Sequence, residues 1–488
     1  MLTDNELAPI VVASTTLQAL FGGGGVVADD ASVIRGQISL PEYQRPYRWN
    51  AFQFERLLVD LAQFATQSRS NGPDGNAYYL GSIILHQGTA EAGKPEVLNI
   101  IDGQQRLTSM AILGCLLGTV PSLPGLRFSP ESQARIKANT RWLRTRPGAL
   151  PQVDFSRVNI TLVVTSSEDD AYRFFETQNT GGVRLDGPAI MKAHHLRAVK
   201  RENQDAFARQ WEAMGELATL VDAVMKARHW QGLRWRELAS YREPSKMRDE
   251  VVAELQGKEG QGRADIAYRP VRFSHDAGGW SQHLAANGYA MRQPLNTGVN
   301  TIRYLQYFQA LRKELFVAKS DPALSSFYKL YRSLSVKARP SDFLHKLFDA
   351  ALLLYASQFG TGKLFEASLW LFRAIASPRL SNKTTVREST VQAFARSSLV
   401  LDKIAASYNH DELMEHLQDF SYVVDPSSLK DGTVKSVKSK FINNLAKELD
   451  LGALPTDPDA LAKSYDRNLV DAIRRLTHGA PAPEKVAA

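Results

Sequence analysis

The sequence predicts an α+β protein, in which an N-terminal α/β domain precedes a mostly α-helical C-terminal region. In the N-terminal part, short β-rich runs alternate with helical patterns, at residues 37–40, 79–85, 97–101 and 158–164. Farther along, apolar residues recur at helical spacing over residues 207–225, 301–319, 343–359, 364–376 and 390–406. The opening segment, to about Leu20, is also expected to be a helix.

The length and composition indicate a globular protein of several domains. At 488 residues, and with roughly 100 to 200 residues per domain, we expect a domain over 1–200 and a helical and loop-rich linker or insertion over 201–300, with its loops over 257–300. A helical domain over 301–480 and a frayed tail over 481–488 follow. The longest apolar stretches, such as 350–356, fall far short of the roughly 20 residues that span a bilayer. The sequence therefore predicts a cytoplasmic protein without a membrane partner.

The charge balance makes an anionic partner plausible, because the formal net charge is +8 and the sequence pI is about 9.3. In residues 226–248, seven basic residues interleave with Trp230, Trp235 and Tyr241, which suits nucleic acid but equally suits a salt-bridged helix pair. A second patch has fewer acidic neighbours, and we favour it slightly as a basic stripe: Arg135, Lys137, Arg141, Arg144 and Arg146. The only cysteine, Cys115, is expected to be a buried core residue.

The run from Asp102 to Arg106 is the strongest candidate for a phosphate-binding loop. It joins a predicted strand to a predicted helix, so unpaired N–H groups of the helix N-terminus can attract an anion, and Gly103 lets a ligand approach the backbone. Arg106 can donate two hydrogen bonds to a phosphate, and Asp102 can bind Mg²⁺ or a sugar hydroxyl. From spacing alone, a helix-capping Asp with a surface Arg is at least as good an interpretation.

Four ordered blocks resemble a known family. They are YQRPYRW at 43–49, LGSI at 80–83, IDGQQRLTSM at 101–110, and FFETQNTGGVRL at 174–185 with Lys192 following. In order and spacing they are similar to the GmrS/SspE-type N-terminal domain family, which is ParB/sulfiredoxin-like and occurs in modification-dependent restriction and antiphage systems. The resemblance implies a ParB/sulfiredoxin-like NTP-binding domain with the DGQQR motif, and hydrolysis of the nucleoside triphosphate in some members.

The resemblance also implies a set of site residues. Asp102 would hold Mg²⁺ or act as a base, Gln104 or Gln105 would orient the attacking water, and Arg106 would neutralise phosphate charge. The nucleotide would be lined by Gln44, Arg45, Arg48, Gly103, Thr108, Asn179, Gly181 and Lys192. For Arg45, an ion pair with Glu42 or Glu55 is the alternative. Tyr43 and Tyr47 are more often packing residues than base-stacking platforms, and Trp49 is expected in the core.

Several relatives carry a C-terminal HNH-type nuclease, but this sequence lacks a clear His motif of that kind. The nearest candidates are the run from Asn409 to Asp411, His416, and the pair Asn443 and Asn444, which lie in patterns of ordinary amphipathic helices. We expect His416, and likewise the pair His194 and His195, to lie on solvated helix faces. The GTGK run at 360–363 lacks the spacing of a phosphate-binding P-loop and is expected to be an inter-helix turn.

Together these observations favour an NTP-binding, NTP-hydrolysing sensor subunit of a bacterial antiphage system. It would act on foreign or modified phage DNA and pass the signal to a separate nuclease subunit. Two alternatives stay open: a non-catalytic DNA-binding module switched by nucleotide, and a self-contained nuclease with a divergent C-terminal metal site around His410 or His416. No motif fixes the oligomeric state, so a homo-oligomer is also open.

Overall fold

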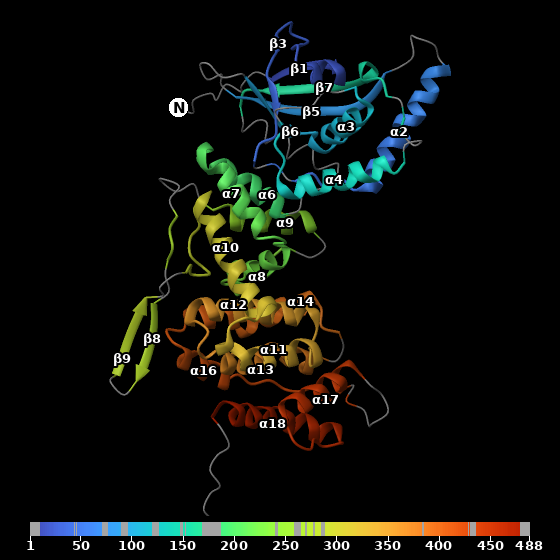
Figure 1. Ribbon diagram of the computed structural model, residues 1–488. Helices are drawn as coiled ribbons and strands as arrows, with labels where there is room; N and C mark the ends of the chain where they lie inside the picture. The colour runs from blue at the N-terminus through green and yellow to red at the C-terminus, as the bar shows by residue number, and fades with distance from the viewer. Residues whose placement is uncertain are drawn as a thin grey trace, which may run out of the picture. The chain divides into compact units, whose positions relative to one another are not determined.

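The computed structural model divides the chain into two compact units, one of residues 1–196 with 204–209 and one of residues 197–203 with 210–488 (Figure 1). The structure describes residues 10–42, 44, 46–70, 77–88, 96–119, 126–146, 150–151, 153–167, 187–239, 243–257, 265–268, 271–276, 279–284, 288–382, 385–427, 429 and 436–478.

The N-terminal unit is built on a mixed five-stranded sheet, within the described part of the chain. The strand order is β1-β7-β5-β6-β4. β5 runs parallel to β7 and β4 parallel to β6, whereas β1–β7 and β5–β6 are antiparallel. The strand bounds are β1 Ile10–Thr16, β4 Gln37–Ser39, β5 Tyr78–Gln87, β6 Val97–Asp102 and β7 Val158–Thr165. The expected α/β domain is thereby confirmed.

The N-terminal segment differs from the expected helix. Residues Ile10–Thr16 form β1, which pairs in full with β7, and Leu17–Gly22 form a helix, α1, while residues 1–9 lie outside the described part of the chain. The sequence of β1 is IVVASTT, and β-branched residues of this kind fit a pleated surface better than a helix. The helical interpretation of residues 10–16 was therefore wrong. Thr16 begins α1, since its Oγ1 accepts a hydrogen bond from the Ala19 N–H at 3.2 Å.

The helices of the N-terminal unit lie between and after these strands. They are α2 (Ala51–Ser70), α3 (Gln104–Leu117), α4 (Pro130–Arg144) and most of α6 (Gly187–Ala198), with a short 3₁₀ turn η2 (Phe155–Arg157). A small hairpin of β2 (Val26–Val27) and β3 (Val33–Ile34) follows α1. α7 (Arg201–Ala213) contributes to both units.

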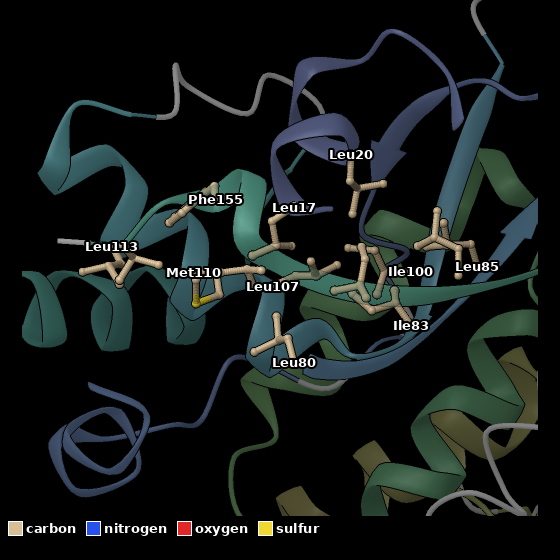
Figure 2. Close-up of a cluster of buried hydrophobic side chains, with 14 of the residues drawn as sticks. Leu17, Leu20, Leu80, Ile83, Leu85, Ile100, Leu107, Met110, Leu113 and Phe155 are labelled. Atoms are coloured by element: carbon tan, nitrogen blue, oxygen red, sulfur yellow. The ribbon is translucent and has the colours of Figure 1, made fainter. Parts of the chain in front are cut away.

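One apolar core holds the sheet and helices α1 to α4 together. Alternate residues of the central strands face it, as the period of two along a strand requires. Figure 2 shows side chains of α1, β5, β6 and α3 directed toward one another, among them Leu17, Ile83, Ile100 and Leu107. These four residues are at most 1% exposed. Because α3 begins where β6 ends, this packing fixes the position of the loop between them.

The C-terminal unit is mostly helical, as expected. Its helices are α8 (Ala218–His229), α9 (Pro244–Gln256), α10 (Val299–Lys313), α11 (Ser325–Arg332), α12 (Asp342–Phe359), α13 (Leu364–Ser381), α14 (Glu388–Ser398), α15 (Val400–Ala406), α16 (His410–Gln418), α17 (Val437–Leu449) and α18 (Pro458–His478). α12 packs against α8, α13 and α15. Residues 257–300, expected to be loop-rich, contain a hairpin of β8 (Val271–Asp276) and β9 (Gly279–Leu284).

Two expected helices are each divided in the structure. The segment 207–225 breaks between α7 and α8, where Gly215 has φ +75°, and the segment 390–406 breaks between α14 and α15 at Leu399, with φ +51°. A left-handed residue ends an α-helix, because the chain direction changes there. The GTGK run forms the turn between α12 and α13, as expected. No helix in the described segments is long and apolar enough to cross a membrane.

The inner strand β7 provides a test of this core. Leu162 is fully buried on β7, so we expect Leu162→Ala to lower the free energy of unfolding by about 2 to 5 kcal/mol. Val27→Ala, at a side chain 66% exposed, should change it by less than about 0.5 kcal/mol. Urea denaturation of the full chain measures both, and hydrogen exchange of the β7 amides locates the loss. Equal effects of the two substitutions would contradict the core described here.

Candidate nucleotide site

The junction of β6 and α3 forms a helix N-terminus with no side chain to cap it. Asp102 ends β6, and Gly103 takes φ +90° and ψ 0° before α3 begins at Gln104. A Cβ at Gly103 would lie 3.1 Å from Ile83 Cγ1 on the neighbouring strand, so both the backbone angle and the space favour glycine. The first N–H groups of a helix lack intrahelical partners. This junction can therefore receive an anion through its backbone.

Gln105 holds the loop that follows β4. Its Oε1 accepts hydrogen bonds from the backbone N–H groups of Arg48, at 2.8 Å, and Trp49, at 3.2 Å. Its Nε2 donates to the Pro46 carbonyl at 3.3 Å. The side chain is 6% exposed, so these bonds form away from water. The amide of Gln105 therefore fixes residues 46–49, and both its oxygen and its nitrogen are engaged in doing so.

Gln104 lies beside Gln105 in the sequence but has the opposite hydrogen-bonding state. Its residue is 5% exposed, and neither Oε1 nor Nε2 finds a hydrogen-bond partner among the residues that the structure describes. Burying an amide without partners costs about 1 to 3 kcal/mol. A buried donor and acceptor at an uncapped helix N-terminus provide the contacts that a polar ligand would make.

Arg106 reaches back to β5. Its Nη1 donates to the Leu80 carbonyl at 3.2 Å, and its Nη2 donates to the Ser82 carbonyl at 2.8 Å. Nη2 also forms an ion pair with Asp102 Oδ2 at 3.3 Å. The register of β5 against β7 shifts between Tyr79 and Gly81. Arg106 therefore binds a β-bulge and orients the carboxylate of Asp102.

Gly81 is the residue that makes room for this arginine. It has φ +117°, and a Cβ there would overlap Arg106 Nη1. Glycine is required by the left-handed backbone and by the close approach of the guanidinium. The sequence block LGSI and the DGQQR loop therefore contact each other directly, through Arg106 and the backbone of residues 80–82.

A buried polar network anchors the same loop to α3 and α4. The hydroxyl of Tyr47, a fully buried residue, lies 2.7 Å from Ser109 Oγ. Asn139 Nδ2 donates to the Tyr47 hydroxyl at 3.2 Å and to the Trp49 carbonyl at 2.8 Å. Ser132 Oγ accepts the Tyr47 N–H at 2.9 Å. Burial raises the pKa of the Tyr47 hydroxyl, which therefore stays protonated in this network.

Of the remaining expected residues, Gln44 and Lys192 are linked to the junction by hydrogen bonds, whereas no such link is described for the side chains of Arg48 and Thr108. Gln44 Nε2 donates to the carbonyl of Ile101, at 3.0 Å, one residue before Asp102. Lys192, only 4% exposed, donates from Nζ to the Gln44 carbonyl at 3.3 Å. Arg48 is half-exposed and its Nε lies 4.0 Å from a Glu131 carboxylate oxygen. Thr108 is buried on α3 at 2% exposure.

The structure brings together most, but not all, of the expected site. Gln44, Gly103, Gln104 and Lys192 lie around one junction, while Arg45, Asn179, Gly181 and Tyr43 lie outside the described residues. For Arg45 the ion-pair alternative is therefore untested, although Glu55 pairs with Arg146 at 3.0 Å. Ser109, Ser132 and Asn139 were missed. Ser132 and Asn139 are seven residues apart on α4, which places them on one face of the helix. This spacing is the signal that could have identified these two residues.

Two expectations about single residues were wrong. Cys115 is exposed, since the final turn of α3 carries it away from the core that buries Leu113. His195 is fully buried rather than solvated, and its ring centroid lies 5.2 Å from that of His194. Cys115 lies in a nearly continuous apolar run and His195 lies in a run of mixed polarity. Neither run shows a clear buried face in the sequence, so the exposure of the two residues could not be predicted from it. Trp49 is half-buried against the core.

The basic segment 226–248 is salt-bridged and buried in its first part, whereas Arg234, Trp235 and Arg236 are exposed. Lys226 pairs with Asp222, and Arg228 pairs with Glu254 at 3.1 Å. Both basic residues are under 9% exposed, as is Trp230 at 8%. These groups are tied into the fold of the C-terminal unit and are not displayed to a polyanion.

The histidines considered for a metal site have structural partners or lie in solvent. His410 is 8% exposed, with Nδ1 at 2.7 Å from the Tyr355 hydroxyl and Nε2 at 3.2 Å from Glu366 Oε2. His416 is exposed, as expected. Within the described segments no group of three or more His, Cys, Asp or Glu side chains is placed to hold a metal ion.

Family comparisons agree with this division of the chain. Residues 30–196 match the family described as GmrSD restriction endonuclease, N-terminal domain. The chain therefore carries a GmrSD-type N-terminal domain of restriction and antiphage proteins, as the sequence blocks indicated. Residues 203–431 match a family of unknown function, DUF7834. A comparison with curated proteins finds no match.

The two neighbouring glutamines should respond in opposite ways to the same substitution. Gln105→Met leaves the N–H groups of Arg48 and Trp49 without their acceptor, so we expect a loss of about 1 to 3 kcal/mol in the free energy of unfolding. Gln104→Met removes an unpartnered buried amide, so stability should stay within about 1 kcal/mol of the original or increase. Urea denaturation without ligand measures both. A larger loss for Gln104→Met than for Gln105→Met would contradict the assignment.

Gly81 and Arg106 should be energetically coupled. We expect Gly81→Ala to lower the free energy of unfolding by about 1 to 3 kcal/mol because of backbone strain. The loss should be larger if the new methyl group also displaces the Arg106 guanidinium. In an Arg106→Ala background the overlap is absent, so the same substitution should cost less. A double-mutant cycle of unfolding free energies measures the difference. Additive effects would show that the two residues do not share this contact.

Proposed function

We propose that the N-terminal unit binds a nucleoside triphosphate at the β6–α3 junction and hydrolyses it. The observation that carries this proposal is Gln104, whose buried amide has no partner in the described structure and lies at an uncapped helix N-terminus. Phosphate groups bind readily at such termini, because the N–H groups and the helix dipole both favour negative charge. Membership in the GmrSD N-terminal domain family supports the proposal.

The roles of the motif residues follow from which of their atoms are engaged. Gln105 acts as a positioning residue, since its amide holds residues 46–49. Gln104 is then the glutamine that contacts the nucleotide or orients the attacking water. Arg106 donates to two carbonyls of β5, so its contribution to phosphate binding would require this side chain to shift or to act through its charge.

Asp102 is the residue that fits a magnesium ion. Mg²⁺ is commonly held by one or two carboxylates together with substrate phosphates and water. Asp102 ends β6 next to Gly103, its side chain is 26% exposed, and Arg106 contacts only one of its oxygens, Oδ2, among the contacts described. A bound Mg²⁺ would neutralise phosphate charge there. Asp102 would hold the magnesium ion next to the backbone N–H groups of α3.

We further propose that the chain is a sensor subunit of an antiphage system that acts on foreign or modified DNA, with cleavage in a separate nuclease. The net charge of +8 and the restriction-type family support a DNA partner. The sequence has no HNH-type His motif, and its nearest candidate, His410, is engaged by Tyr355 and Glu366. These contacts favour a structural role for His410 over a nuclease role.

A nucleotide-binding assay on purified protein tests the core of the proposal. We expect Gln104→Met to weaken the binding of a non-hydrolysable NTP analogue about tenfold or more, because a buried hydrogen bond to a charged ligand is worth about 1.5 to 3 kcal/mol. Gln63→Met, on the exposed surface of α2, is the matched control and should bind as the original does. Calorimetry with Mg²⁺ present gives both affinities.

Steady-state phosphate release from each NTP distinguishes the forms of the proposal. Binding and turnover that both depend on Gln104 would support an NTPase. Binding without turnover would select a nucleotide-switched module. Failure of the original protein to bind any NTP, or equal affinities of Gln104→Met and the control, would overturn the nucleotide site itself.

A further inference from the structure

The outer face of α4 carries a set of basic side chains without ion pairs in the described part of the chain. Lys137, Arg141 and Arg144 are exposed, and none forms an ion pair with another described residue. With 3.6 residues per turn, their i, i+4, i+7 spacing places them on one face of the helix. We call these three residues the α4 stripe.

The other basic residues of this region behave differently. Arg146, just beyond α4, pairs with Glu55 at 3.0 Å and lies over the Trp142 ring at 4.8 Å. Arg135 is exposed but lies two residues before Lys137, and so points to another side of the helix. The expected stripe of five is therefore a stripe of three with two flanking charges.

The surroundings of the α4 stripe suit a phosphate backbone. Its neighbours on the helix surface, Ala134 and Ala138, are exposed and small, and the one acidic residue of α4 is Glu131, in its first turn. The stripe extends over about 10 Å of helix axis, at a rise of 1.5 Å per residue. A DNA strand presents one phosphate per roughly 3.4 Å of duplex axis, so a stripe of this length spans about three phosphate steps of one strand.

The opposite face of α4 is fixed to the nucleotide site. Ser132 and Asn139 are at most 2% exposed, and they hold the backbone of Tyr47 and Trp49. Gln105 holds the same loop from α3. A polyanion on the α4 stripe would therefore sit at a defined position relative to the β6–α3 junction, within one compact unit.

We propose that the α4 stripe is a contact surface for the phosphates of duplex DNA and that it reads no base sequence. The choice of DNA as the polyanion rests on the proposed function. The assignment of the α4 stripe as a polyanion-binding surface rests on the exposure, spacing and charge of its side chains. Lysine and arginine on one exposed helix face donate hydrogen bonds to phosphate oxygens, and such contacts fix the position of a duplex without carrying sequence information directly. Recognition of a DNA modification then belongs to other residues of the protein.

The test compares two triple variants of the full chain with equal loss of charge. One carries Lys137→Ala, Arg141→Ala and Arg144→Ala. The control carries Arg35→Ala, Arg56→Ala and Arg332→Ala, at three exposed positions on other elements. Fluorescence anisotropy measures the affinity for two short DNA duplexes of unrelated sequence over a range of salt concentrations, and calorimetry with an NTP analogue measures the nucleotide affinity of each preparation.

We expect the stripe variant to bind both duplexes about tenfold or more weakly, and equally so. Its slope of log affinity against log salt should fall in magnitude by roughly 2 to 3, the release expected from three phosphate contacts. The control should retain its slope and nucleotide affinity should be unchanged in both. Equal losses in the two variants, no loss in the stripe variant, or a loss confined to one sequence would each overturn the inference.

Competition experiments decide the class of polyanion. If single-stranded RNA or vesicles of anionic lipid bind more tightly than duplex DNA, and lose binding in the stripe variant, the surface belongs to that partner and the DNA proposal is wrong. If the original protein binds no NTP but the stripe variant alone loses DNA, the proposed nucleotide site fails while this surface stands. The two proposals are thus separable in one set of preparations.

Discussion

The hydrogen bonds of the Gln105 amide are the contact on which the candidate site depends. One buried side chain accepts two backbone N–H groups and donates to one carbonyl of the same loop. Without this acceptor, residues 46–49 would leave polar backbone buried between α3 and α4, and such groups are rarely left unpaired. The loop in turn contacts Ser132 and Asn139, so α3 and α4 are joined through it.

The adjacent residue shows how position on a helix separates two identical side chains. Gln104 and Gln105 have the same chemistry and nearly the same burial, but successive helical residues point about 100° apart. One amide therefore holds the loop, and the other, on the first residue of the helix, has no partner among the described residues. Such a buried amide is a cost, and a ligand that supplies a donor and an acceptor would remove it.

The sequence predicted several elements of the N-terminal unit but not the contacts that hold its motif residues in place. Strands β5, β6 and β7 and helix α3 follow from local patterns, because each is long and strongly apolar. β1 was not predicted, since its identity as a strand depends on pairing with β7, far along the chain. The engagement of Arg106 with the bulge at Gly81 likewise depends on contacts between distant segments. A motif indicates that residues act together, but only the folded backbone shows which atoms remain to bind a ligand.

A crystal structure of the protein with a non-hydrolysable NTP analogue and Mg²⁺ would show directly whether the β6–α3 junction binds nucleotide. We expect the phosphates to lie against the N–H groups at the start of α3, with Gln104 Oε1 or Nε2 within hydrogen-bond distance of the nucleotide. Gln105 should keep its bonds to residues 46–49. A nucleotide bound elsewhere, with the Gln104 amide buried and without contact to it, would rule out the proposed site.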